Sequence, residues 1–217
     1  YDSAQNSYNK AYDIYARQKL TKKQAQILVN MGALQENKGD FSSALKYYFD
    51  LLSLTDSAAL KMEHSRVHIN IGVVYLNQQK YESALDHFKK AIPLKREVKD
   101  KEGEALVYNN MGIAYYYLGE YDKVLNNFKR SLNIYRQLND LGKQALPYFN
   151  IAEIHYEQGE LKKALYYYKK SYEIERQLNN MSDQAVSLMS IGNVYKELNK
   201  YSDAVRVQQE AVKILKE

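Results

Sequence analysis

The side chains of this sequence that are best suited to hold another molecule are asparagine amides that recur at a constant interval along the chain. The series, which we call the amide ladder, is Asn30, Asn70, Asn110 and Asn150. An asparagine side chain carries two N–H donors and one acceptor oxygen, so it can bond both the N–H and the C=O of a peptide unit. Each such bond contributes about 0.5–1.5 kcal/mol. The ladder therefore predicts a surface for an extended peptide of any sequence; the alternative is that these amides are solvated or bonded to a neighbouring turn.

Aromatic residues stand close to the amide ladder in the sequence. Aromatic rings without a role in the core often carry binding energy. We therefore expect Tyr116, Tyr117, Phe149 and Tyr156 to gather in the middle of the same surface, although some of them would also be suited to pack between helices. The remaining candidates for ligand binding are Asn109, Ile113, Glu153 and Asn193.

Acidic residues predict a local charge that differs from the net charge of the chain. Glu153, Glu157 and Glu197 would make the C-terminal half of the predicted surface negative. This favours a ligand with a lysine, an arginine or a free amine. The alternative is that the three carboxylates are simply solvated.

The sequence contains few residues whose types and spacing would suit catalysis or metal binding. The chain has no Cys, which excludes a thiolate metal site and a cysteine nucleophile. His64 and His68 have i, i+4 spacing, but they lack both a third ligand and the glutamate of a metalloprotease motif. We expect His155 to be a core residue bonded to a neighbour and His87 to lie on the surface. We predict that the chain is not an enzyme and uses no metal or cofactor.

The elements that position these side chains follow from an internal repeat with a period of about 40 residues, which no insertion interrupts. Within each repeat, apolar residues at helical spacing predict two amphipathic helices. The sequence is therefore predicted to be all-α. The aligned columns are Gly32, Gly72, Gly112, Ala152 and Gly192; Gln35, Tyr75, Tyr115, His155 and Tyr195; Phe41, Tyr81, Tyr121, Leu161 and Tyr201; and Ala44, Ala84, Val124, Ala164 and Ala204.

The repeat boundaries predict a single domain over residues 1–217 with about eleven helices. Five repeats follow a leading half repeat, and because neither end carries an obviously polar capping helix, we expect the chain to be part of a longer protein. Residues 53–64 diverge most, which predicts a longer or looser connection. The predicted segments are 1–20 (the second helix of a truncated repeat), 21–60, 61–100, 101–140, 141–180 and 181–217.

Glycine and proline mark positions where the helices end or bend. Gly39, Gly119 and Gly159 occupy the turn within a repeat, where a helix end favours a left-handed residue. Gln79 stands at the same place, at a cost of roughly 1 kcal/mol if its φ is positive. Pro93 is expected to kink its helix or end it early, and Pro147 predicts either a helix that begins near Ala145 or a bent one.

Composition excludes several classes of protein. The net charge of +5 comes from charges of mixed sign, which argues against a nucleic-acid partner. No apolar run approaches the length of about 20 residues that spans a bilayer, so we expect no membrane contact, and no signal peptide opens the chain. We expect a cytoplasmic location, with a periplasmic one as the alternative for a membrane-anchored sensor.

The aligned columns resemble those of the tetratricopeptide repeat, as in Tyr108, Gly112, Tyr115, Phe128 and Ser131. The resemblance covers essentially the whole chain, although the usual period of that repeat is shorter, at about 34 residues. The 40-residue form is similar to the repeats of spindle-orientation adaptors, kinesin light chains, Rap-type peptide receptors and bacterial sensor or regulator proteins. It implies a right-handed α-solenoid of antiparallel helix pairs whose first helices line a concave, ligand-binding wall.

Three functions are consistent with this resemblance. The first is a scaffold that grips a peptide or partner segment in its groove, as the interaction or sensory region of a larger bacterial regulator. The second is a receptor for a short signalling peptide that controls an attached effector. The third is a structural scaffold that associates with itself end to end.

Overall fold

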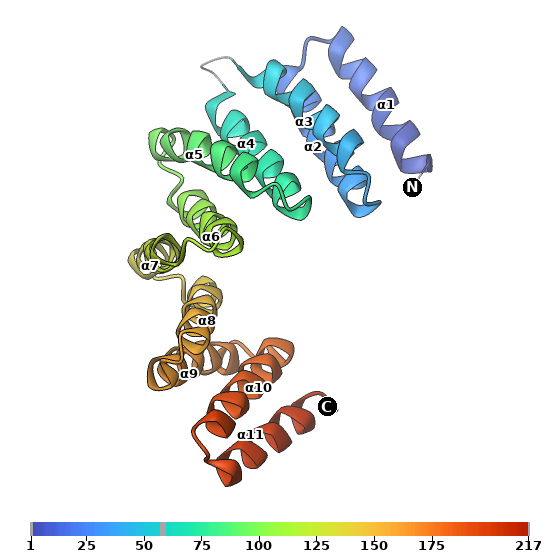
Figure 1. Ribbon diagram of the computed structural model, residues 1–217. Helices are drawn as coiled ribbons and strands as arrows, with labels where there is room; N and C mark the ends of the chain where they lie inside the picture. Colours follow the sequence, from blue (N-terminus) through green and yellow to red (C-terminus); the bar gives the residue numbers. More distant parts are fainter. Residues whose placement is uncertain (1, 57–59, 217) are drawn as a thin grey trace. The chain divides into compact units, whose positions relative to one another are not determined.

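The described part of the chain, residues 2–56 and 60–216, forms eleven α-helices and no strand in this computed structural model (Figure 1). The predictions of an all-α fold and of eleven helices are therefore confirmed. None of these helices combines the length and the apolar character that crossing a bilayer requires. The helices are α1 (Asp2–Arg17), α2 (Thr21–Asn37), α3 (Phe41–Thr55), α4 (Lys61–Asn77), α5 (Tyr81–Glu97), α6 (Lys101–Tyr117), α7 (Tyr121–Gln137), α8 (Leu141–Glu157), α9 (Leu161–Gln177), α10 (Met181–Glu197) and α11 (Tyr201–Ile214).

The helices divide into two compact units, an N-terminal unit (Tyr1–Leu118) and a C-terminal unit (Gly119–Glu217). Each unit is a stack of helix pairs. The single domain over 1–217 stays a prediction. The expected longer connection within 53–64 falls partly on residues 57–59, which lie outside the described residues.

In the N-terminal unit, each helix packs against the next one in sequence, and α4 also contacts both α2 and α6. The first helices of successive repeats are therefore neighbours. The core of this unit lies between α2, α3 and α4. It includes Leu28, Tyr48, Leu51 and Ile71, all of which are buried. Burying a side chain of this size contributes about 1.5–3 kcal/mol. Because no helix pair can cover its apolar face alone, this stability depends on stacking.

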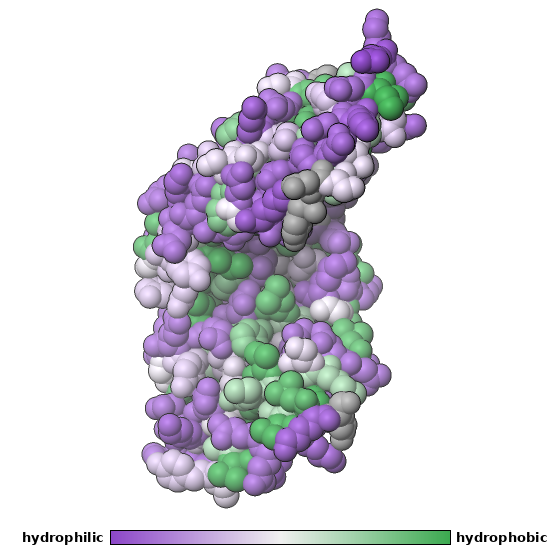
Figure 2. Space-filling model, turned by 90° about the vertical axis from the view of Figure 1, so that its right-hand side faces the viewer, coloured by the Kyte–Doolittle hydropathy of each residue, from purple (hydrophilic) through white to green (hydrophobic). Residues whose placement is uncertain are grey.

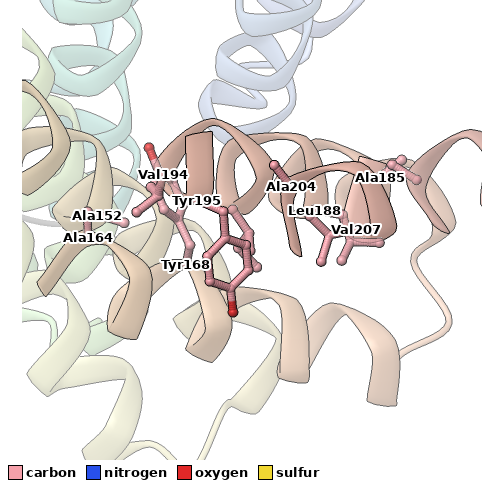
Figure 3. Close-up of a cluster of buried hydrophobic side chains, with 11 residues drawn as sticks. Ala152, Ala164, Tyr168, Ala185, Leu188, Val194, Tyr195, Ala204 and Val207 are labelled. Atoms are coloured by element: carbon pink, nitrogen blue, oxygen red, sulfur yellow. The ribbon is translucent and has the colours of Figure 1, made fainter. Parts of the chain in front are cut away.

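The C-terminal unit buries a corresponding core between α8, α9, α10 and α11 (Figure 3). Ala152 and Ala164 keep α8 and α9 close together, and Tyr168 fills the space beside them. Leu188 and Val207 bring α10 and α11 together in the same cluster. The columns of small residues in the repeat therefore allow the helices to approach closely, while the columns of large residues fill the spaces between helices.

A left-handed turn ends nearly every helix. At the end of α2, the N–H of Asp40 donates to the C=O of Gln35 (2.9 Å) and the N–H of Gly39 donates to the C=O of Glu36 (2.8 Å). This is the Schellman pattern, which satisfies the last carbonyls of a helix. It recurs between repeats as well as within them, so it also closes second helices. The described residues with positive φ are Lys19, Gly39, Gln79, Lys99, Gly119, Asn139, Gly159, Asn179 and Asn199.

The positive φ of 58° at Lys99 predicts that a glycine there stabilises the N-terminal unit. A residue with a Cβ pays about 1–2 kcal/mol in this conformation. Glycine removes that penalty but loses about 0.5–1 kcal/mol through its freer unfolded chain. We expect Lys99→Gly to raise the free energy of unfolding by about 0.5–1 kcal/mol in urea denaturation followed by circular dichroism.

The control for this prediction is Gly39→Ala, because a Cβ at Gly39 would meet no atom within 4 Å and only the backbone changes. We expect it to lower the free energy of unfolding by a similar amount. A loss of stability in Lys99→Gly would contradict the backbone explanation.

The two prolines do not shorten their helices. α5 contains Pro93 and runs over the same 17 residues as its neighbours, so the early end expected there is wrong. α8 contains Pro147 and begins at Leu141, so it does not begin near Ala145. In both helices, the packing of adjacent helices on either side outweighs the loss of one backbone hydrogen bond.

Candidate functional site

The N-terminal unit carries a groove between α4 and α6 with a volume of about 470 Å³. The two helices contact each other, and Tyr81, the first residue of α5, also lines the groove. Three of the predicted ligand-binding residues, Asn110, Ile113 and Tyr117, lie together in its wall. The residues of this α4–α6 groove are Val73, Leu76, Asn77, Gln79, Tyr81, Asn110, Ile113 and Tyr117.

Tyrosine rings form one end of the α4–α6 groove. Tyr117 is 58% exposed although it is a large aromatic residue. Its ring stacks on Tyr81, with centroids 4.9 Å apart and planes 8° apart, and Tyr116 meets it edge-on at 5.3 Å. Tyr81 is not among the residues predicted to bind a ligand, so its place in the groove was not predicted. These stacked rings hold an aromatic face open to a ligand.

The amides of the ladder are half-buried in all four repeats. Among the described residues, no hydrogen bond is made by the side chains of Asn70 and Asn110, which leaves their donors and acceptors available. Asn30 accepts a hydrogen bond from Gln26 at 3.3 Å, and Asn150 is already engaged within the molecule. The amide of Asn30 is thus bonded within its own helix, and ligand binding by the ladder, like its alternative of solvation, stays a prediction.

Asn109 is not at the surface. Its side chain is only 4% exposed, and Val107 and Tyr108 beside it are buried too. α6 packs against α5 and touches α4, so its buried face is wide enough to include Asn109. This corrects the expectation that Asn109 contacts a ligand.

In the C-terminal unit, the predicted residues of α8 pack partly onto α9. Phe149 is half-buried and lies edge-on to Tyr168 at 5.3 Å. Glu153 accepts a hydrogen bond from the hydroxyl of Tyr168. Burial raises the pKa of Tyr168, and the bond to Glu153 raises it further. Glu153 is therefore partly structural rather than simply solvated.

Negative charge gathers around Tyr156 in the C-terminal unit. Burial raises the pKa of Tyr156, and the negative charges of Glu197 and Glu153 raise it further. Glu157 and Asn193 are exposed on α8 and α10. This arrangement agrees with a locally acidic surface in this unit. The gathering of Phe149 and Tyr156 with Tyr116 and Tyr117, which belong to the other unit, stays a prediction.

The histidines form two separate arrangements. His68 lies between His64 and His87, with ring centroids 5.1 Å from each, and its Nδ1 is 3.0 Å from Nδ1 of His87. His87 also approaches Tyr75 and is half-buried, so the expectation that it is a surface residue is wrong. Burial, together with the charges of His87, His64 and Lys90, lowers the pKa of His68 to about 4. The rings of His68 and His87, whose pKa values are both lowered by burial, therefore help to pack α4 on α5.

His155 is a core residue, as predicted. It is 5% exposed, its Nδ1 is 2.5 Å from Oε2 of Glu160, and its ring stacks on Tyr167. Within the described part of the chain, no group of three or more His, Asp or Glu residues is arranged to hold a metal ion.

Comparison with known proteins defines the family. A model of the tetratricopeptide repeat matches residues 63–137 and 143–217, which is most of the chain. The chain belongs to the tetratricopeptide repeat family. Proteins with this repeat are in general interaction scaffolds rather than catalysts. A sequence search of curated proteins gives no significant match.

Solved structures share the fold at low sequence identity. BtubC (BKLC) from P. vanneervenii superposes with a TM-score of 0.88 at 16% identity, over 98% of this chain and 88% of that one. The apo form of RapI superposes with a TM-score of 0.81 at 19% identity, over 97% of this chain and 59% of RapI. A Rap protein complexed with competence and sporulation factor has a TM-score of 0.71 at 17% identity, over 90% of this chain and 54% of that protein. This chain therefore spans little more than half of either Rap protein.

Proposed function

We propose that the chain is a non-enzymatic scaffold module that binds an extended peptide or partner segment in the α4–α6 groove and along the corresponding helices of the C-terminal unit. The observation that carries the proposal is the half-buried amide of Asn110, which has no internal partner among the described residues and lines the groove together with the exposed ring of Tyr117. The amide of Asn70, which is on α4, is also half-buried and without such a partner. The amides suit the peptide backbone and the ring suits a side chain. Peptide binding in the family supports this use of the first helices.

A second candidate is a receptor for a short signalling peptide that controls an attached effector. The Rap protein complexed with competence and sporulation factor favours it, because the fold of this chain is similar to part of that protein. In both cases we propose that the module serves a larger bacterial regulatory protein. The cytoplasmic location and the end-to-end association stay predictions.

The groove is tested with peptides selected from a random 12-residue display library on the whole chain. We expect Asn70→Ala/Asn110→Ala to weaken the binding of the selected peptides about tenfold to a hundredfold, because each amide contributes about 0.5–1.5 kcal/mol and 1.4 kcal/mol is a factor of ten. Fluorescence anisotropy of labelled peptides measures the change in Kd.

The matched control is Asn126→Ala/Asn133→Ala, which removes two exposed amides of the second helix α7. It should leave the Kd unchanged. A library that yields no binding peptide, or equal Kd values for wild type and the groove variant, would rule out the amide contacts.

A further inference from the structure

A small pocket of about 270 Å³ lies in the C-terminal unit where α8 and α10 begin and α9 ends. Its apolar wall includes Leu146, Phe149 and Val186, and two carboxylates, Glu175 and Asp183, also line it. Leu146 is 56% exposed and Val186 is 47% exposed, so the entrance is open to solvent. Among the described residues that line it there is no Lys, Arg or His. This α8–α10 pocket thus combines exposed apolar side chains with one buried acid, Glu175, and one exposed acid, Asp183.

Glu175 is the buried acid of the pocket, with an exposed fraction of 5%. Its Oε1 accepts a hydrogen bond from the hydroxyl of Ser171 at 2.8 Å. Its Oε2 is buried and accepts no hydrogen bond from any described residue. The hydroxyl of Ser187 is close enough to favour the charged form of the Glu175 carboxyl group, but it is not in hydrogen-bonding geometry with Oε2. Burial raises the pKa of Glu175, and the negative charge of Asp183 raises it further.

Other buried charges in this chain are paired internally. Lys95 occupies the column of Glu175 two repeats earlier, is 3% exposed, and lies 2.7 Å from Oδ2 of Asp100. Glu104 is 4% exposed in its side chain and pairs with Arg96 at 2.7 Å and Lys101 at 3.2 Å. The carboxylate of Glu175 has no such cation among the described residues. The sequence around it supplies a second acid, Asp183, instead of a base.

A cation in the pocket would offset the unpaired negative charge of both carboxylates. Burying a carboxylate is costly unless it is paired, and its stabilisation requires an opposite charge with hydrogen bonds to its oxygens. The volume of about 270 Å³ is below the roughly 300–1,000 Å³ of ordinary small-molecule sites, which favours one side chain or a small amine. The apolar mouth is suited to the methylene stem of such a group.

We propose that the α8–α10 pocket binds an ammonium or guanidinium group on an alkyl stem, whose positive charge lies beside the carboxyl group of Glu175 while the stem packs against Leu146, Phe149 and Val186. Asp183 adds attraction from α10. The occupant is a lysine or arginine side chain of a peptide, or a free alkylamine. The pocket shares no residue with the α4–α6 groove, so the proposal stands without the peptide function of that groove.

The test uses the whole chain and four probes. These are a 12-residue peptide with one central lysine, the same peptide with norleucine in its place, cadaverine, and n-pentanol as a neutral alkyl control. Binding is measured from shifts of backbone amide signals of residues 142–186 in two-dimensional NMR. We expect the lysine peptide to bind at least tenfold more tightly than the norleucine peptide. Binding of cadaverine as well assigns the site to free amines, and binding of the peptide alone assigns it to a peptide side chain; both support the proposal.

Two variants locate the interaction. Glu175→Gln keeps the shape of the side chain and should weaken the lysine peptide at least tenfold, whereas Glu173→Gln, an exposed acid on the same helix, should not. The comparison of the lysine and norleucine peptides needs no variant, so it decides the matter even if Glu175→Gln folds poorly. Equal affinity of the two peptides, no response to either amine probe, or unchanged binding in a folded Glu175→Gln would overturn the proposal.

Discussion

Replacing Asp100 with alanine is expected to destabilise the N-terminal unit by about 3–5 kcal/mol, because it leaves the ammonium of Lys95 buried without a partner. Lys95 is 3% exposed and its Nζ lies 2.7 Å from Oδ2 of Asp100. Asp100 also caps α6, since its Oδ1 accepts the N–H of Gly103 at 2.8 Å. Both functions depend on one carboxylate. Urea denaturation of the whole chain, followed by circular dichroism, measures the change.

The control is Asp140→Ala in the next repeat. Asp140 caps α8 in the same way, accepting the N–H of Lys143 at 3.1 Å, but the side chain of its lysine partner is 44% exposed. We expect this variant to cost about 1 kcal/mol, the usual value of a lost cap. Equal costs for the two variants would show that the buried charge pair contributes nothing.

The same pair predicts a pH dependence. Burial by itself raises the pKa of Asp100, but the hydrogen bonds from Lys95 and Gly103 and the charge of Lys95 outweigh it and lower the pKa below 3.8. A carboxyl whose pKa is lower in the folded state contributes stability above its unfolded pKa and loses it as the pH falls through the folded value. The difference in stability between wild type and Asp100→Ala should therefore shrink below about pH 4.

Replacing Phe88 with alanine is expected to lower the free energy of unfolding by about 3–5 kcal/mol, as is usual for removing a buried phenylalanine. Phe88 is fully buried, and its ring lies against Gly72 on the facing helix. α4 and α5 meet through this contact. Chemical denaturation with the same optical signal gives the difference.

A double-mutant cycle tests whether this contact explains the glycine of the repeat. A Cβ at Gly72 would lie 2.4 Å from Cε1 of Phe88, so Gly72→Ala overpacks the pair and should cost about 1–2 kcal/mol after its gain in helix propensity. In the Phe88→Ala background, the same change fills part of the cavity and should be neutral or stabilising. At Gly192, a Cβ would meet the flexible side chain of Gln208, so Gly192→Ala should be tolerated. Additive effects of Gly72→Ala and Phe88→Ala would contradict the contact.

Periodicity allowed the fold to be predicted, because an uninterrupted repeat fixes where each helix pair begins and which columns face inward. The sequence could not show that the turns after second helices are left-handed, because Lys19 and Lys99 have no preference for that conformation. The expected early end at Pro93 and the expected start near Ala145 were wrong for a related reason. Helix packing on both sides keeps Pro93 and Pro147 within their helices, and local propensity contains no such information.

The exposure of the candidate site was predicted in part, and its contact with a ligand stays a prediction. Asn70 and Asn110 are half-buried and Tyr117 is exposed, because their columns lie beside the packing columns. Asn109 is only one residue away from the ladder, but one residue turns an α-helix by about 100°, which places it on the buried side. No feature of the sequence indicated that Glu175 is buried. A single acidic residue in a helix looks like any surface glutamate until the tertiary structure shows that α8 and α10 cover it.

Hydrophobic patches alternate with hydrophilic residues on the face shown in Figure 2. Some of the exposed apolar side chains of the protein lie near the helix starts of the C-terminal unit, including Leu141, Leu146, Met181 and Val186. A partner that covers them would gain apolar contacts in addition to its polar ones.

The left-handed turns at the helix ends bear on how such a chain changes over generations. Because nearly every described helix closes in the same way, a stretch of one repeat length can be copied or lost between two turns while the flanking helices keep their ends and their spacing. The number of helix pairs would then grow or shrink in whole steps, and the length of the stack would follow the length of the gene.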